Sequence, residues 1–293
     1  MNIVMFHSGK SLPVFLGDCL KQLRLFNPDI PVYFLINKEH LANPVFNLYN
    51  ITTVDMSKYV SNDVYTFDAL YGRGRDDFWT ITTTRLMYVE NFIFNNNMQD
   101  VYHFENDVLL YADIKKMHPV FVKLYKDLAI TVGGPDKCMT GFMFIKRALP
   151  LRRMTYFFVQ LLKSNSIHKI RKQYKVDMVN EMTLMRIYSK EYPELMKFLP
   201  ILPFGDYSEN YNEFGSIWDP ASYGQYVGGT LNGVPGAKPQ DHYIGQLLEQ
   251  HLDYTVVWKQ EKKGKVPYFK FDGQEVKINN LHIHSKNLNL YVS

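Results

Sequence analysis

The N-terminal part of the chain alternates between short apolar runs and one amphipathic segment. Residues 2–6 and 32–36 are apolar runs with the length of buried strands. Between them, apolar side chains recur at the spacing of a helix that buries one face, at Leu12, Phe15, Leu16, Cys19, Leu20 and Leu23. Asn27 and Pro28 end this segment. A strand, a helix and a strand in this order predict a parallel sheet with both faces covered.

The same pattern continues along the chain. It predicts further strands at 51–54, 101–104, 128–132 and 142–145, and helices at about 80–95, 151–162 and 177–188. Residues 71–77 are polar and rich in glycine, so we expect a surface loop there, and its place before the 80–95 helix suggests a lid. No internal repeat or linker divides the chain. The expectation is one α/β domain, with a mixed, mostly parallel sheet between helices.

Composition excludes several classes of protein. The chain has 293 residues, of which 46% are hydrophobic and 21% charged, which suits a folded core and argues against disorder. The formal charge of +4 is small and the basic residues are scattered, apart from short runs near Arg73 and Lys259, so no nucleic-acid partner is expected. The 21 Tyr and 20 Phe residues suit a carbohydrate-binding surface as well as a core.

The two cysteines and the absence of long apolar runs bear on location. Cys19 and Cys138 are far apart in sequence and have no zinc-site spacing, so we expect both to be reduced. No stretch approaches the roughly 18 apolar residues of a spanning helix. The first residues lack the features of a signal peptide. These observations predict a soluble, cytoplasmic chain without a membrane span.

The strongest candidate chemistry is an acidic triplet directly after the predicted strand 101–104. In open α/β sheets, ligands bind at the carboxyl ends of the strands. Glu105 and Asp107 are two residues apart, so in an extended segment both point to one side and Asn106 points to the other. Such a pair of oxygen ligands suits a divalent cation, which would neutralise a diphosphate. The alternative is an ordinary acidic turn.

An arginine interrupts the apolar face of the predicted helix 80–95. Arg85 shares that face with Ile81, Val89 and Phe92. Burying an unpaired guanidinium costs several kcal/mol, so Arg85 needs an anionic or hydroxyl partner. A phosphate, the hydroxyls of a sugar or a nearby carboxylate would each serve, and a purely structural salt bridge is the alternative.

Four segments carry a family resemblance. Thr83–Arg85 and the later run YHFENDVLLY at 102–111 resemble the core of GT-A-type glycosyltransferases, in which an arginine-bearing helix precedes a strand ending in a D-x-D metal motif. Residues 139–145, MTGFMFI, resemble the small-residue turn of that family, where Gly141 would let the backbone approach the donor sugar. Residues 281–286, LHIHSK, resemble its C-terminal segment, which supplies a third metal ligand and a phosphate contact.

The resemblance implies a GT-A-like domain spanning 1–293, with a nucleotide-sugar-binding half at 1–112 and an acceptor-side half at 113–293. It implies Mn²⁺ or Mg²⁺ at Glu105, Asp107 and His284; Glu105 stands where the motif usually has Asp, and His284 is preferred to His282 because it lies closer to Lys286. The implied contacts to the nucleotide-sugar donor are His7, Ser8, Arg85, Asn106, Gly141 and Lys286.

Two acids are candidates for the base that activates an acceptor. Asp177 and Glu181 are four residues apart on a predicted helix and therefore share a face, and the family has acidic residues in this region, which favours Glu181. Asp219 precedes Pro220 like a helix N-cap, and aromatic residues surround it in the sequence. A solvated helix face and a plain cap are the respective alternatives.

These features together predict a metal-dependent glycosyltransferase. It would move a hexosyl or pentosyl group from a UDP-sugar, or a GDP-sugar, to a hydroxyl of a glycan or other acceptor. A non-catalytic carbohydrate-binding protein, a sugar nucleotidyltransferase and a glycoside hydrolase are the alternatives. A nucleotidyltransferase would normally carry a glycine-rich basic loop after its first strand, where this chain has only Ser8, Gly9 and Lys10.

Overall fold

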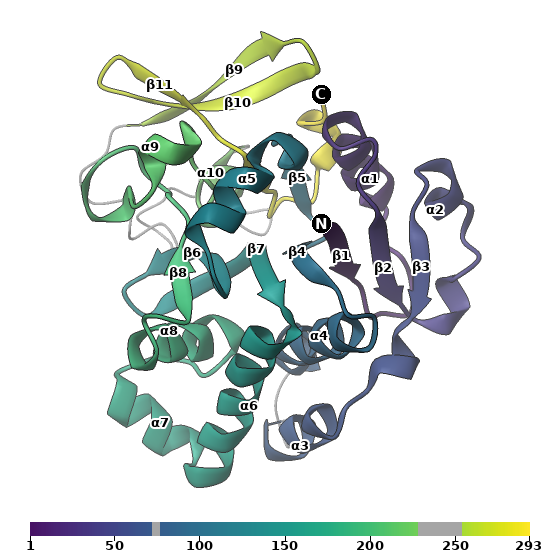
Figure 1. The fold of residues 1–293 in the computed structure, drawn as a ribbon, viewed down its shortest axis with the longest axis vertical. Coiled ribbons are helices and arrows are strands. Elements are labelled where there is room, and N and C mark those ends of the chain that lie inside the picture. Colours follow the sequence, from purple (N-terminus) through teal and green to yellow (C-terminus); the bar gives the residue numbers. More distant parts are fainter. Residues whose placement is uncertain (72–76, 228–253) are drawn as a thin grey trace.

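A seven-stranded sheet forms the centre of the protein. The computed structural model describes residues 1–71, 77–227 and 254–293 (Figure 1). The strand order across the sheet is β3 (Thr52–Asp55), β2 (Val32–Ile36), β1 (Asn2–Phe6), β4 (Gln99–Phe104), β7 (Lys137–Arg147), β6 (Leu128–Gly134) and β8 (Met196–Phe198). Neighbouring strands are parallel except where β7 runs antiparallel to β4 and β6. The predicted α/β class with a mixed, mostly parallel sheet is confirmed.

Helices cover both faces of this sheet (Figure 1). The helices are α1 (Leu16–Phe26), α2 (Pro44–Leu48), α3 (Asn62–Tyr71), α4 (Asp77–Asn95), α5 (Ile114–Leu124), α6 (Ala148–Ser164), α7 (Ile167–Tyr174), α8 (Glu181–Glu191), α9 (Tyr211–Phe214) and α10 (Tyr223–Tyr226). Successive side chains of a strand point to opposite faces. In β1, Ile3 and Met5 therefore join the core under α1 and α5, whereas Val4 and Phe6 join the core under α3, α4, α6 and α8.

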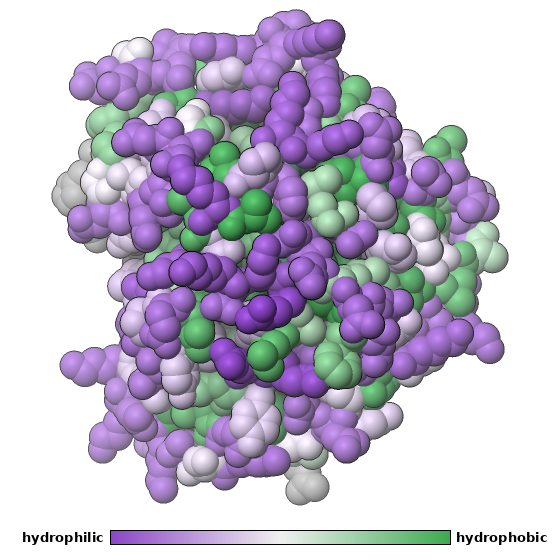
Figure 2. Space-filling view, viewed as in Figure 1, coloured by the Kyte–Doolittle hydropathy of each residue, from purple (hydrophilic) through white to green (hydrophobic). Residues whose placement is uncertain are grey.

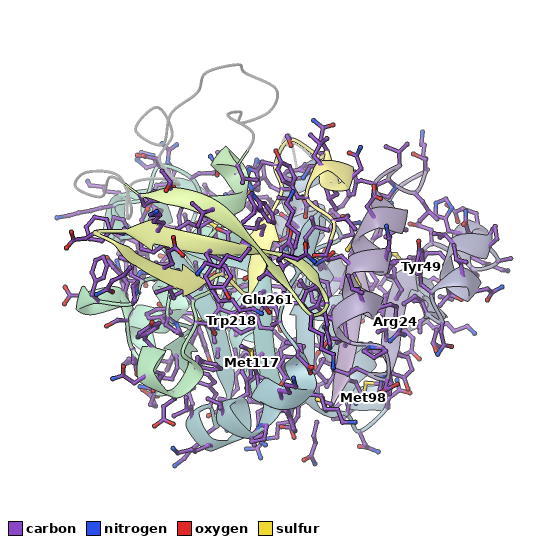
Figure 3. The ribbon with its side chains drawn as sticks, turned by 90° about the horizontal axis from the view of Figure 1, so that it is seen from above. Arg24, Tyr49, Met98, Met117, Trp218 and Glu261 are labelled. Atoms are coloured by element: carbon purple, nitrogen blue, oxygen red, sulfur yellow. The ribbon has the colours of Figure 1, made fainter. Side chains whose placement is uncertain are left out.

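The C-terminal part adds two small sheets. The strands β9 (Thr255–Glu261), β10 (Gly264–Phe271) and β11 (Gln274–Lys277) form an antiparallel meander at one end of the molecule (Figures 1 and 3). The strand β12 (Asn280–His282) then pairs antiparallel with β5 (Val108–Leu110), with His282 opposite Val108. This pairing brings the C-terminal segment beside the acidic triplet that follows β4.

Arg24 on α1 ties the edge of the sheet together. Its guanidinium donates hydrogen bonds to the carbonyls of Ile30 at 2.7 Å, Tyr49 at 2.7 Å and Asn50 at 2.6 Å. Figure 3 shows Arg24 and Tyr49 side by side on this flank. The carbonyls belong to the turns before β2 and β3, so one side chain satisfies backbone groups that no strand pairs with.

Most predicted elements are present, with one consequential shift. The strands at 2–6 and 32–36 have the predicted bounds. The helix expected at 177–188 begins instead at Glu181, because Asn180 and Thr183 exchange the two hydrogen bonds of a capping box at 3.1 and 3.0 Å. Asp177 lies outside the helix and is exposed, so the prediction that Asp177 and Glu181 share a helix face is wrong.

Three further expectations concern the predicted lid, the two cysteines and the absence of a membrane span. Residues 72–76 of the predicted lid lie outside the described residues, so the lid stays a prediction. Both cysteines are buried and free. In the part of the chain that the structure describes, no helix combines the length and the apolar character that crossing a membrane requires.

Candidate functional site

A cavity of about 630 Å³ opens where the acidic triplet follows β4. Its walls come from the loop after β1, the first turns of α4, the strand β7, the start of α8 and the C-terminal segment. The polar side chains that line it are His7, Ser8, Thr82, Arg85, Glu105, Asn106, Asp107, Thr140, Glu181, His282, His284 and Lys286. Most of the residues singled out in the sequence therefore face one cavity.

Arg85 is buried, as its place in the apolar stripe predicts, and it pairs with Glu105. Its Nη2 lies 2.9 Å from Glu105 Oε1 and 2.8 Å from Thr140 Oγ1, and the Thr140 hydroxyl also donates to Glu105 Oε1. Burial alone would raise the pKa of Glu105, but Arg85 and His282 outweigh it and lower the pKa to about 2. Glu105 is therefore an anion whose Oε1 is fully engaged and whose Oε2 points toward His282.

Asp107 meets the C-terminal segment. Its Oδ1 lies 3.2 Å from His282 Nε2, and its Oδ2 accepts a hydrogen bond from Lys286 Nζ. Burial would raise the pKa of Asp107, but His282 and Lys286 outweigh it and hold the pKa well below its usual value. Burial would likewise lower the pKa of His282, and Asp107 and Glu105 raise it instead. Asp107 is thus held as an anion by its basic neighbours.

Glu105, Asp107 and His282 are placed to hold a cation. One ligand atom of each lies within 4.8 Å of those of the other two. Asp107 Oδ1 is buried, and the polar group beside it is His282 Nε2 at 3.2 Å, the third member of the group. Two carboxylates and an imidazole suit Mn²⁺, and carboxylate oxygens suit Mg²⁺. The donor atoms therefore fit a divalent ion.

The histidine in this group is His282, which corrects the preference for His284. The strand β12 ends at His282, so the alternation that would place both rings on one face stops there. The His284 ring packs edge-on against His282, with ring centroids 4.5 Å apart. Burial, and then the charge of His282, lower the pKa of His284 to about 3, which keeps it neutral. His284 lines the cavity beside the carboxylates without joining them.

Gly141 also has a different neighbour from the one expected. A Cβ added at this position would stand 3.1 Å from His282 Nδ1. Gly141 is therefore the place where β7 makes room for the His282 imidazole. It does not line the cavity, so the predicted approach of the backbone to a donor sugar is not what this glycine provides.

Asp219 is buried behind the cavity rather than in it. Its carboxylate accepts four backbone N–H bonds, from Ser222 at 2.7 Å, Tyr223 at 2.9 Å, Gly224 at 2.9 Å and His282 at 2.8 Å. With all four contacts made, no oxygen is left for an acceptor. The helix after it begins at Tyr223, so Pro220 is not a first helical residue. Asp219 holds His282 in place, which corrects the catalytic role predicted for it.

Of the two candidate bases, Glu181 is the one that faces the cavity. It is the first residue of α8, it is only 4% exposed, and its Oε2 accepts a hydrogen bond from Thr82 at 2.8 Å. Burial raises its pKa to about 7, against the opposing charge of Arg85 and the Thr82 bond. A carboxyl group with this pKa exchanges protons near neutral pH, as general acid–base chemistry requires.

The loop after β1 is hydrogen-bonded to the acidic triplet through His7 and Asn106. Asn106 Nδ2 lies 3.2 Å from His7 Nδ1, and His7 Nε2 lies 2.9 Å from the Ser11 carbonyl. The carbonyl can only accept, so His7 carries its proton on Nε2 and accepts from Asn106 on Nδ1. Burial lowers the pKa of His7, which keeps the ring neutral. His7, Ser8 and Asn106 thus form one rim of the cavity.

Sequence reasoning missed the residues that complete the walls. Thr82 donates a hydrogen bond to Glu181, and Thr140 donates one to Glu105. In the sequence, each is only a hydroxyl residue within a segment predicted as a helix or a turn. Met139, Met182 and Ala221 form a small apolar cluster against Trp79. These residues come from four separate segments, so no local spacing would reveal that they meet.

Comparisons with known proteins give similarity in structure only. Neither the models of protein families nor the curated proteins show a match. Among solved structures, mouse xyloside xylosyltransferase 1 in its apo form is similar at 10% identity and a TM-score of 0.49, covering 68% of this chain and 84% of that one. The galactosyltransferase LgtC with donor and acceptor sugar analogues is similar at 15% and 0.40, covering 74% and 79%.

A nucleotide-transferring enzyme is also among the similar structures. A cytidylyltransferase from Leptospira borgpetersenii is similar at 12% identity and a TM-score of 0.37, covering 67% of this chain and 73% of that one. The similar structures thus include several glycosyltransferases, as the sequence motifs predict. With every one of these TM-scores below 0.5, the functional conclusion rests on the side chains of the cavity.

Proposed function

We propose that this protein is a metal-dependent glycosyltransferase that uses a nucleoside diphosphate sugar and a hydroxyl acceptor. The observation that carries the proposal is the convergence of Glu105, Asp107 and His282 on one point of the cavity. Lys286 stands beside them, so a dianionic diphosphate would meet both a bound cation and an ammonium group. A UDP-sugar is the favoured donor and a GDP-sugar the second choice.

Different residues of the cavity would have different roles in binding the donor. A divalent ion bound at Glu105, Asp107 and His282 would stabilise negative charge on the leaving diphosphate. Arg85 holds Glu105 through Nη2, which also contacts Thr140, while its Nε has no partner among the described residues and could donate to a bound donor. The loop at His7 and Ser8 lies at the carboxyl end of β1, where nucleotides bind in open α/β sheets.

Glu181 is the proposed acid–base group of this cavity. Its pKa of about 7 allows it to accept the proton of an acceptor hydroxyl and to release it again near neutral pH. The side chains of Trp79, Met139 and Met182 line the same cavity and would limit the access of water to a bound donor. Exclusion of water favours transfer to a hydroxyl over hydrolysis of the donor.

Thermal unfolding with nucleotides and Mn²⁺ tests the proposal. UDP or GDP together with Mn²⁺ should raise the midpoint temperature of unfolding, because ligands that bind the native state stabilise it. The nucleotide alone or Mn²⁺ alone should raise this temperature less. The matched variants are Asp107→Ala, which should lose the joint effect, and Asp177→Ala, an exposed acid that should keep it. A wild-type protein that shows no metal-dependent nucleotide effect overturns the proposal. Release of UDP from a panel of UDP-sugars then identifies the donor.

A further inference from the structure

Basic residues are concentrated in one stretch, residues 137–176, contrary to the scattered distribution expected from the sequence. This stretch contains ten Lys and Arg residues and no Asp or Glu. The rest of the chain has the other 23 of the 33 Lys and Arg residues and all 29 Asp and Glu residues. The small formal charge of +4 therefore conceals a strongly basic segment within an acidic remainder.

Most of these charges are exposed and uncompensated. The stretch forms β7, α6 and α7. Three of the ten are neutralised by ion pairs, namely Lys137 with Asp136, Lys146 with Asp100 and Arg152 with Glu90. The other seven are exposed, and none pairs with an acid that the structure describes: Arg147, Arg153, Lys163, Lys169, Arg171, Lys172 and Lys175.

Large apolar side chains stand among these charges on the outer face of α6. Leu149, Arg153, Tyr156, Gln160 and Lys163 follow one another at intervals of three and four residues, so they form a single stripe. Leu149 is 45% exposed and Tyr156 is 53% exposed. Apolar and basic groups thus alternate along one helix face.

Neighbouring elements extend this surface. On α4, Phe94 is 51% exposed, and the Arg152 guanidinium of α6 lies 4.2 Å from the centre of its ring. The helix α7 buries Ile170 and exposes Lys169, Arg171 and Lys172. Figure 2 shows hydrophilic residues interspersed with hydrophobic ones over the lower part of the molecule, where Figure 1 places α6 and α7.

We propose that the outer faces of α6 and α7 bind an anionic membrane surface. Basic side chains near an anionic bilayer each add to the affinity. Tyrosine favours the boundary between headgroups and acyl chains, and exposed leucine and phenylalanine side chains can enter it. Leu149, Tyr156 and Phe94 supply these groups between the charges. Exposed leucine makes no contact with phosphate and gains most from an apolar phase, which is why the lipid surface is the partner we assign.

The surface lies near the cavity along the chain. Glu181, which lines the cavity, follows Lys175 by six residues, and six residues span at most about 20 Å. Docking through α7 would therefore hold the cavity close to the bilayer. If the proposed glycosyl transfer is correct, acceptors carried on lipids become accessible; the docking itself does not depend on the reaction.

Vesicle sedimentation with the full chain tests the docking surface. The wild-type protein should sediment with phosphatidylcholine–phosphatidylserine vesicles and not with phosphatidylcholine alone, and high salt should release it. Replacing Lys169, Arg171, Lys172 and Lys175 together with Ala should weaken binding at least about tenfold, since each charge contributes separately. Tyr156→Ser should weaken binding at constant charge.

The control removes equal charge elsewhere. Lys21, Lys58, Lys115 and Lys262 are exposed residues on other parts of the molecule, and their joint replacement with Ala should change binding less than about twofold. Equal losses of vesicle affinity in the two quadruple variants overturn the proposal. A wild-type protein that does not sediment with anionic vesicles also overturns it. Tight binding to duplex DNA without vesicle binding overturns it in favour of a nucleic-acid surface. No donor or metal is needed, so failure here is distinct from failure of the proposed transferase activity.

Discussion

The carboxylate of Asp219 accepts the backbone N–H of His282 at 2.8 Å, across 63 residues of sequence. The same carboxylate accepts three further N–H bonds from the segment at Ser222–Gly224. His282 stands between this buried anchor on one side and Glu105 and Asp107 on the other. The position of the imidazole is therefore set from behind, by a residue that does not reach the cavity.

Asp219→Asn should lower both the stability of the protein and its affinity for Mn²⁺, although Asp219 does not line the cavity. The substitution keeps the shape but replaces one accepting oxygen with an NH₂ group that faces N–H donors. Hydrogen bonds to a charged group contribute about 1.5–3 kcal/mol each, so we expect a loss of roughly 2–4 kcal/mol in the free energy of unfolding and a lower affinity for Mn²⁺. Urea unfolding and calorimetric Mn²⁺ titration measure the two effects. Unchanged Mn²⁺ affinity in the folded variant would contradict the positioning role.

His282→Ala and His284→Ala form a matched pair. His282 Nε2 lies 3.2 Å from Asp107 Oδ1 and 3.5 Å from Glu105 Oε2, whereas His284 packs against the His282 ring. We expect His282→Ala to reduce Mn²⁺ affinity by about 10–100-fold or more, and His284→Ala to reduce it by less than that. Electron paramagnetic resonance of free Mn²⁺ gives both affinities. The reverse order would restore His284 as the ligand.

Arg85→Lys should act through Glu105. One guanidinium nitrogen donates to both Glu105 Oε1 and Thr140 Oγ1, and a lysine ammonium on a flexible stem does not reproduce that planar geometry. We expect the free energy of unfolding to fall by about 1–3 kcal/mol and Mn²⁺ affinity to fall with it. Thr140→Ser, which keeps the hydroxyl, is the control and should change little. A variant with normal stability and normal Mn²⁺ affinity, but weak nucleotide binding, would assign Arg85 to the donor instead.

Glu181 should make stability depend on pH. Burial raises its pKa from 4.5 to about 7, so the folded state binds this proton more tightly than the unfolded state. Stability contributed by the protonated carboxyl is fully present below about pH 4.5 and is lost as the pH rises through about 7. Relative to wild type, Glu181→Gln should therefore become more stable as the pH rises across this range, by at most about 3 kcal/mol.

Urea unfolding of both proteins at several pH values between 4.5 and 8 measures this difference. Asp177→Asn, a change at an exposed acid just before α8, is the control and should give a pH profile close to that of wild type. A difference between wild type and Glu181→Gln that stays constant with pH would show that Glu181 has an ordinary pKa in the folded protein.

Several strands and helices of the fold could be predicted from the spacing of apolar residues along the chain. Continuous apolar runs placed β1 and β2 at their observed bounds, because a strand buried on both faces needs apolar side chains at every position. The spacing of three and four residues around Arg85 predicted that its guanidinium would be buried and would need a partner. That partner is Glu105, one of the predicted possibilities.

Two of the errors arose where contacts between distant segments decide, and one arose from a local helix cap. The choice between His282 and His284 depends on the pairing of β12 with β5, which ends at His282, and sequence alternation alone treats the two rings alike. The start of α8 at Glu181 depends on the capping box of Asn180, which outweighs the apolar spacing that suggested an earlier start. Asp219 has the local signature of a cap, and its fourth hydrogen bond comes from β12.

Within the elements whose bounds it predicted correctly, the sequence by itself determined which side chains share a face, because that depends only on the period of each element. It also placed Glu105 and Asp107 at the end of a strand. Only the tertiary structure decided which faces meet. Glu105 follows β4, Glu181 begins α8 and His282 ends β12, and their convergence follows from strand pairing and helix packing that no local pattern encodes.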